Sequence, residues 1–172
     1  IFSREQFLAW FDLDHLGKSA AQFDEAKLRW VNAQHLKAMP PEALAAAVAP
    51  FVARLGLNAD DARLPALCAL YKDRCDTLVV LANWAKAFYA DVTPVAEELA
   101  KHVTGAVRPA LAQLAERLQA CNTWDAPAIA AAIKETLTAC QLKMPQLAMP
   151  MRVLVMGTAQ TPSLDAVLAL SK

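Results

Sequence analysis

Glycine is scarce in this sequence, and its four glycines lie far apart. A loop that cradles phosphate groups needs closely spaced glycines, so their absence excludes a phosphate-binding loop of that kind. The sequence also lacks the Gly-x-Ser-x-Gly pattern of a serine nucleophile and the His-Glu-x-x-His pattern of a zinc protease. The three histidines are scattered over separate predicted elements. We therefore find no catalytic residues and favour recognition over catalysis.

The cysteines lack the spacing of metal ligands. Cys68, Cys75, Cys121 and Cys140 include no Cys-x-x-Cys pair, and no histidine clusters with them. Because 56% of the residues are hydrophobic, we expect four buried, reduced thiols in a cytoplasmic protein. We expect no metal ion and no other cofactor on this chain.

Long apolar runs are absent as well. No run of about 18 or more apolar residues occurs, and we see no signal peptide, so we expect no membrane contact. The hydrophobic residues suffice for the core of one medium domain or two small ones. The chain begins at Ile1, without an initiator methionine and directly before a capped helix, which suggests a piece of a longer protein.

Seventeen basic and 17 acidic residues give zero net charge, which argues against nucleic-acid binding by bulk electrostatics. Any such binding must come from local groups of cations. No acidic residue occurs between Glu135 and Asp165, so Lys143 and Arg152 have no counter-charge nearby in the sequence.

The last thirty residues contain strong local signals for where helices begin and end. We expect Pro150 to open a short helix that carries Arg152, and Gly157 to end it. Thr161 and Pro162 are expected to supply the N-cap and first position of a final helix. Two helix N-termini would then face one loop and suit a ligand rich in phosphates. The local pattern also allows two packed helices with a solvated arginine.

Periodicity and capping signals predict an all-α fold. The only strand-like run, 151–156, is too short and too isolated to build a sheet. No repeat of fixed period occurs. Helix starts are expected at Ser3, with Gln6 completing a capping box, and at Asp24, Pro41, Asp76, Thr93 and Asp125.

The helix expected at 24–38 carries a mixed stripe. At 100° per residue, Lys27, Trp30, Gln34 and Lys37 fall within one narrow stripe. Lysines would meet phosphates while the indole covers a sugar or base, which suits contact with a nucleic-acid backbone. The alternative is a partly buried Trp30 beside merely solvated lysines, and the pattern does not decide between them.

Arg74 lies where two helices are expected to meet, flanked by Asp73 and Asp76. From spacing alone, an ion pair with one of these carboxylates is the favoured interpretation.

Three stretches carry a further signal. They are Phe23-Asp-Glu-Ala-Lys-Leu-Arg-Trp30-Val-Asn32, then Arg74-Cys-Asp76-Thr-Leu78, and finally Met149-Pro-Met-Arg152-Val-Leu-Val-Met-Gly157 with Thr161-Pro-Ser-Leu164. In order and approximate spacing they resemble bacterial glutamyl-tRNA synthetases. The corresponding family segments read Phe-Asp-x-x-Lys-Leu-x-Trp-x-Asn, Arg-x-Asp-Thr-Leu, and Pro-Leu-Arg…Gly…Thr-Pro-x-Leu.

This resemblance implies the carboxy-terminal, tRNA-binding half of an aminoacyl-tRNA ligase that attaches glutamate to its tRNA. It divides the chain into the end of a stem-contact region at 1–39 and two helical anticodon-binding subdomains at 40–91 and 92–172. The catalytic domain, with its ATP and magnesium, would lie outside this chain. We expect a monomer whose partner is the glutamate-accepting tRNA.

The resemblance also assigns tRNA contact to seven positions. These are Lys27 and Trp30, then Arg74 at the third anticodon base, and Arg152, Thr161, Pro162 and Leu164 around the first anticodon base.

The chemistry of the third base makes the Arg74 assignment sensible. A guanidinium can donate to the ring nitrogen and carbonyl of cytosine, whereas guanine presents donors on the same edge. Glutamate and glutamine anticodons differ there by C versus G. Within the family, arginine at this position goes with enzymes that accept only the glutamate tRNA. Cys75 departs from the larger apolar residue of many relatives, so we expect local repacking.

Two other functions remain compatible with the sequence. One is an all-helical protein–protein interaction scaffold that uses the alanine-rich helices as docking faces and has no nucleic-acid role. The other is a small-molecule pocket lined by Met144, Met149 and Met156.

Overall fold

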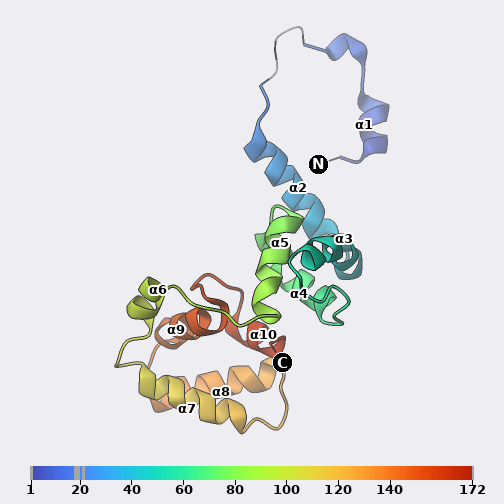
Figure 1. The fold of residues 1–172 in the computed structure, drawn as a ribbon. Coiled ribbons are helices and arrows are strands. Elements are labelled where there is room, and N and C mark those ends of the chain that lie inside the picture. The colour runs from blue at the N-terminus through green and yellow to red at the C-terminus, as the bar shows by residue number, and fades with distance from the viewer. Residues whose placement is uncertain (1, 18–19, 21, 172) are drawn as a thin grey trace.

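The computed structural model describes residues 2–17, 20 and 22–171, and every regular element in these ranges is a helix (Figure 1). The all-α prediction is thus confirmed. The α-helices are α1 (Arg4–Trp10), α2 (Glu25–Ala38), α3 (Pro41–Arg54), α4 (Leu64–Tyr71), α5 (Leu78–Ala85), α6 (Ala96–His102), α7 (Arg108–Gln119), α8 (Ala126–Ala139), α9 (Met144–Met156) and α10 (Leu164–Ala169). Short 3-10 turns are η1 (Leu13–His15), η2 (Lys72–Arg74) and η3 (Lys86–Phe88).

Several helices start where the capping signals predict. The Ser3 backbone N–H donates to Gln6 Oε1 at 2.8 Å, and the Gln6 N–H donates to Ser3 Oγ at 3.2 Å, which completes the capping box. The carboxylates of Asp24 and Asp125 accept from the backbone N–H three residues on, at 3.0 and 2.9 Å. Pro41 is the first residue of α3.

Two predicted starts are wrong. Thr77, not Asp76, caps α5, because the Thr77 Oγ1 accepts a backbone hydrogen bond at 3.2 Å while the Asp76 carboxylate contacts α2. The Thr93 cap also fails, since α6 begins only at Ala96, after an extended Val95, and has no side-chain cap. Proline disfavours the helical conformation of the residue before it, so Pro94 disfavours a helix start at Thr93.

The helix that carries Arg152 begins earlier than predicted. α9 starts at Met144, with Pro145 in its first turn, and the Lys143 N–H donates to Gln146 Oε1 at 2.7 Å. Pro150 therefore lies inside α9, where its side chain is buried, instead of opening a helix. The predicted end is confirmed by Gly157, which adopts the left-handed conformation.

The predicted cap of the last helix is wrong as well. α10 starts at Leu164 and has Ser163 at its N-cap position. Thr161 is only 4% exposed, and its hydroxyl donates to the Pro162 carbonyl oxygen at 3.1 Å instead of capping a helix. The loop between the two helices thus meets the C-terminus of α9 and the N-terminus of α10, so two N-termini do not face it.

Buried side chains form two hydrophobic clusters. The first lies among α2, α3, α4 and α5, and the second among α7, α8, α9 and α10. Met156 of α9 and Val167 of α10 belong to the first cluster although their helices also build the second. The carboxy-terminal helices thus join the clusters, while the N-terminal part of α2 extends away from them (Figure 1). The domain boundaries at 39/40 and 91/92 stay a prediction.

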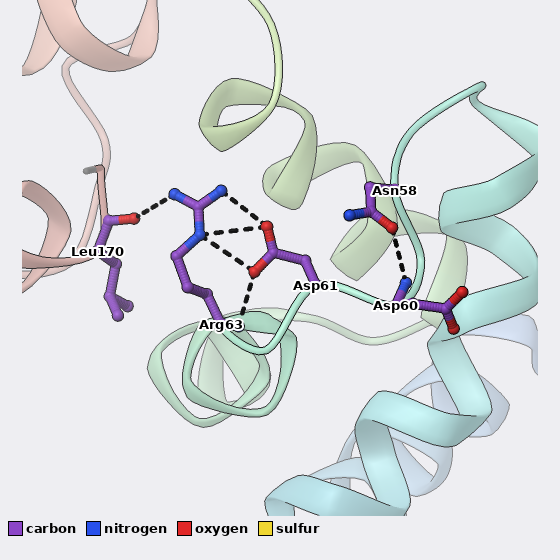
Figure 2. A network of polar contacts seen from close by, with 5 residues as sticks. All are labelled: Asn58, Asp60, Asp61, Arg63 and Leu170. Carbon is purple, nitrogen blue, oxygen red and sulfur yellow. Dashed lines mark hydrogen bonds and ion pairs between the residues drawn. The ribbon is translucent and has the colours of Figure 1, made fainter.

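A partly buried arginine adds a polar link between the first cluster and the end of α10 (Figure 2). Arg63, just before α4, donates from Nη1 to the Leu170 carbonyl oxygen at 3.1 Å and from Nη2 to Asp61 Oδ2 at 2.8 Å. Its guanidinium lies 5.5 Å from the centroid of the Tyr89 ring. The hydrogen bond from Arg63 is the main cause that lowers the pKa of Asp61. The end of α10 is thereby held against the first cluster.

In the part of the chain that the structure describes, no helix combines the length and the hydrophobicity that a membrane crossing requires.

Three glycines allow a matched test of the end of α9. A Cβ at Gly157, where φ is 72°, would lie 2.7 Å from Val92 Cγ1. Gly56 has φ 74° but, like Gly105, has no such neighbour within 4 Å among the described atoms. We expect Gly56→Ala to cost about 1 kcal/mol of unfolding free energy, Gly157→Ala to cost more, and Gly105→Ala to cost least. Denaturant unfolding followed by circular dichroism measures the series, and equal losses at Gly56 and Gly157 would contradict the contact with Val92.

Replacing the linking arginine should weaken the fold in a pH-dependent way. We expect Arg63→Gln to lower the unfolding free energy at pH 7 by about 1 to 3 kcal/mol, because Asp61 and the Leu170 carbonyl lose a charged donor. The folded pKa of Asp61 is lowered, so its stabilisation is present above the unfolded pKa and is lost as pH falls through the folded value. The difference between the two proteins should therefore shrink below about pH 4.

The exposed Arg108 provides the control, and Arg108→Gln should leave stability nearly unchanged. A stability loss in Arg63→Gln that stays constant from pH 7 to pH 3 would show that the Asp61 carboxylate is not part of the link.

Candidate nucleic-acid interface

The loop between α4 and α5 displays Arg74 to solvent. Turn η2 ends at Arg74, and Cys75 follows in an extended conformation with φ −117° and ψ 136°. The Cys75 side chain is only 2% exposed and packs in the first cluster, whereas Arg74 is exposed.

The rest of this loop is held in place by α2 and its end. The Lys72 ammonium donates to the Met39 carbonyl oxygen at 3.3 Å. The Asp76 carboxylate accepts from Arg29 Nη1 at 3.2 Å, and the Asp76 carbonyl accepts from the Asn32 amide. Bonds on both sides of Arg74 thus fix its backbone while its side chain stays available.

The ion pair that spacing favours for Arg74 is not formed. Asp76 pairs with Arg29 instead, and within the described ranges no hydrogen bond or ion pair involves the Arg74 guanidinium. Burial raises the pKa of the neighbouring Tyr71 phenol, and the charge of Arg74 partly opposes that rise. Arg74 is therefore an exposed cation beside a buried aromatic ring, with its donors free for a ligand.

Both assigned side chains of α2 face solvent. Trp30 is 56% exposed, and its contact with a nucleic acid stays a prediction. Lys27 is exposed one turn earlier on the same helix. Since Arg29 ties α2 to the loop at Asp76, the structure places Lys27 and Trp30 on an element in contact with the Arg74 loop.

A second site lies between α8, α9 and the start of α10. An open pocket of about 370 Å³ is lined by Arg152 and Leu164 together with Met144, Ser163 and Asp165. That volume is within the range that small ligands occupy. The Arg152 Nε is buried and has no hydrogen-bond partner among the described residues. A buried donor without a partner is costly, so an acceptor on a ligand would stabilise this side chain.

The other two assigned residues near this site are covered. Thr161 and Pro162 are both buried and lie outside the pocket lining. The pocket with three methionines is wrong, because Met144 lines this site, Met149 lines a separate pocket between α6 and α9, and Met156 is buried in the first cluster.

The Arg74 loop and the Arg152 pocket are separate. Arg74 precedes α5 beside α2, and α5 runs from there toward the second cluster, where α9 carries Arg152 (Figure 1). The residues at 78–88 of α5 and η3 account for roughly 16 Å of helical rise. The site residues therefore form two groups, each with one arginine.

Sequence reasoning missed the residues that orient the Arg74 loop. Arg29 and Asn32 lie in a quoted motif, as does Asp76, but they meet across 47 and 44 positions of sequence. No local pattern predicts such a contact. The family motifs indicated that both segments belong to the tRNA-binding region, but not that they contact each other.

The cysteines follow the expectation in part. All four are free thiols, and Cys68 and Cys75 are buried, whereas Cys121 and Cys140 are only half-buried. Burial raises the pKa of Cys68 and of Cys75 to about 11, so both thiols stay uncharged at neutral pH. Over residues 2–17, 20 and 22–171, no group of three His, Cys, Asp or Glu side chains is arranged to hold a metal ion.

Comparison with known proteins gives a family match over most of the chain. The model of a family described as anticodon binding domain matches residues 43–171, which span α3 to α10 and both clusters.

The relatives are glutamate–tRNA ligases. The one from Albidiferax ferrireducens is 66% identical over 170 residues, which cover 99% of this chain and 36% of the relative. The one from Leptothrix cholodnii is 54% identical over 171 residues, with 99% and 36% covered. The chain thus spans about a third of the length of these relatives.

A crystal structure has the same fold. The glutamate tRNA ligase from Elizabethkingia meningosepticum matches with a TM-score of 0.90 at 22% identity, over 100% of this chain and 34% of that one. At that identity the likeness concerns the fold alone.

Proposed function

This chain belongs to the family of anticodon binding domains, and from that membership we propose that it selects the tRNA for a glutamate–tRNA ligase. The main support for the proposal comes from Arg74. Its guanidinium is exposed and has no partner in the described structure, while hydrogen bonds on both sides hold its backbone in place. A free cation on a rigid loop suits recognition of a base edge. The family match does not favour the alternative of a protein–protein scaffold.

We assign Arg74 to the third anticodon base. Cytosine offers acceptors on its pairing edge, which the guanidinium fork can satisfy, whereas guanine offers N–H donors there. A guanine would leave the arginine facing donors. The site would therefore favour an anticodon that ends in cytosine, as in glutamate tRNA, over one that ends in guanine.

The Arg152 pocket is assigned to the first anticodon base. Its wall combines apolar side chains, Met144 and Leu164, with the partly buried guanidinium of Arg152. An unpaired base presents both a flat apolar face and polar edge atoms, so it matches such a pocket. Thr161 and Pro162, being buried, would support the pocket from behind rather than touch the base.

α2 is assigned to the tRNA backbone. The exposed Lys27 ammonium would neutralise a phosphate, and the exposed Trp30 indole would cover a sugar or base. These contacts carry little sequence information, and they would orient the tRNA toward Arg74.

The longer protein would supply the chemistry. We infer that ATP and magnesium act in a catalytic part outside this chain, where glutamate is activated and transferred to the tRNA. We also infer that the protein works as a monomer in the cytoplasm, because tRNA selection needs only one copy of each group of site residues described above.

Loss of the Arg74 guanidinium should reduce selectivity at the third base. We compare binding of this chain to glutamate tRNA and to the same tRNA with G in place of C at that base, at fixed salt. The unmutated chain should prefer C, and Arg74→Gln should reduce the preference by roughly tenfold to a hundredfold, since an unpaired desolvated donor costs about 1 to 3 kcal/mol.

Arg54→Gln is the matched control, because Arg54 is another exposed arginine, at the end of α3, and its loss should leave the preference intact. Equal binding of both tRNAs by the unmutated chain would refute selectivity at this base. No binding of either tRNA would favour the scaffold.

Loss of the Lys27 charge should act differently. Lys27→Gln removes a phosphate contact, so it should weaken binding of both tRNAs by the same factor and reduce the slope of log K against log salt by about one. Lys134→Gln on the distant α8 is the control, because Lys134 is also exposed but lies far from α2. A changed preference between the tRNAs in Lys27→Gln would place Lys27 at a base instead.

A further inference from the structure

The Asp76 side chain is a potential competitor for Arg74. The two residues lie two positions apart on either side of Cys75, and at the same separation Asp61 and Arg63 form an ion pair in this chain, with 2.8 Å between Asp61 Oδ2 and Arg63 Nη2. An aspartate so placed would be the natural ion-pair partner of Arg74. A pair of this kind would occupy the donors that a base must meet.

Arg29 binds the Asp76 carboxylate, which would otherwise compete for Arg74. Its Nη1 lies 3.2 Å from Asp76 Oδ2, and its Nε lies 2.9 Å from Glu25 Oε1 in the previous turn of α2. Glu25 thus steers the guanidinium, which then reaches across to Asp76 with its free end. The pKa of Arg29 is raised, first by the hydrogen bond to Glu25 and then by that to Asp76, as expected for a cation between two carboxylates.

The backbone of Asp76 is held by the same helix. The Asn32 amide donates to the Asp76 carbonyl oxygen, one turn beyond Arg29 on α2. Two residues of one helix, Arg29 and Asn32, therefore hold both the side chain and the backbone of Asp76 against α2. The Arg74 guanidinium remains without a partner in the described structure.

We propose that Arg29 is a positioning residue for specificity, which binds the Asp76 carboxylate and so keeps the Arg74 guanidinium available for an unpaired base. This proposal rests on the proposed role of Arg74. Without Arg29, the Asp76 carboxylate pairs with Arg74. The binding free energy that Arg74 contributes with a cytosine is then reduced, because the ion pair with Asp76 must first be broken. The loss falls on discrimination between bases rather than on overall affinity.

The test compares four variants of this chain, Arg29→Gln, Asp76→Asn, the double variant and Arg74→Gln. The affinity of each variant is measured for glutamate tRNA with C and with G at the third anticodon base, at one salt concentration. Arg29→Gln should reduce the preference for C by about two- to fivefold, the range of an exposed ion pair. Asp76→Asn should keep the preference, and the double variant should recover it, because both lack the competing carboxylate.

Glu25→Gln is the matched control, because it removes the other partner of Arg29 and leaves the Asp76 pair in place. It should keep most of the preference. Circular dichroism confirms that each variant is folded, and Asp76→Asn tests the idea even where Arg29→Gln does not fold.

Three results would overturn the proposal. If Arg29→Gln weakened the binding of both tRNAs equally, Arg29 would be a phosphate contact. If the double variant lost the preference for C as Arg29→Gln does, or if Asp76→Asn alone lost it, the ion pair would serve only to hold the loop in place. If Arg74→Gln also left the preference unchanged, the assignment of Arg74 itself would fail, whereas a selective role for Arg74 with an unaffected Arg29→Gln would remove only this inference.

Discussion

Burial of the Cys75 side chain is the constraint on which the Arg74 loop depends. Cys75 lies between η2 and α5, and its thiol packs in the first cluster between an exposed Arg74 and a half-buried Asp76. An arginine and an aspartate two residues apart can pair, as Arg63 and Asp61 do elsewhere in this chain. The structure then has to separate an arginine from an aspartate that would otherwise pair. It does so with α2, which means that the helix offering Lys27 to a ligand also decides whether the loop beside it is available.

Zero net charge is consistent with nucleic-acid recognition once paired and unpaired arginines are distinguished. Arg29 and Arg63 are bound to carboxylates, and their role is to hold a helix or a helix end in place. Arg74 and Arg152 form no ion pair in the described ranges, so their donors remain for a ligand. The ion pairs of the described structure therefore use other cations and leave the guanidinium groups of Arg74 and Arg152 without a bound carboxylate. A neutral chain of this kind avoids strong unspecific binding to phosphates, because non-specific affinity grows with the number of cations that meet the backbone.

The sequence predicted those parts of the structure that depend on a few neighbouring residues. The caps at Asp24 and Asp125 were found because a carboxylate and the N–H three residues on are all that a cap needs. Pro150 was misread, because proline is compatible with both a helix start and a buried helix interior, and only packing decides. The contact between Arg29 and Asp76 could not be predicted from local patterns, because it joins residues 47 positions apart. Family motifs indicated the arginine of the α4–α5 loop, but they did not show what keeps it unpaired.

Two separated recognition groups are useful only if their relative position is fixed. The covalent connection between the clusters runs through residues 91–95, which have no regular structure and alone would let the clusters move. Met156 and Val167, however, insert from the second group of helices into the first cluster, and Arg63 holds the Leu170 carbonyl beside them. A ligand that reaches both groups then meets a surface that needs little further ordering, and the second contact forms at high effective concentration once the first is made. Modest contacts at each base can therefore multiply into strong selectivity, because the cost of aligning the two groups has already been met when the chain folds.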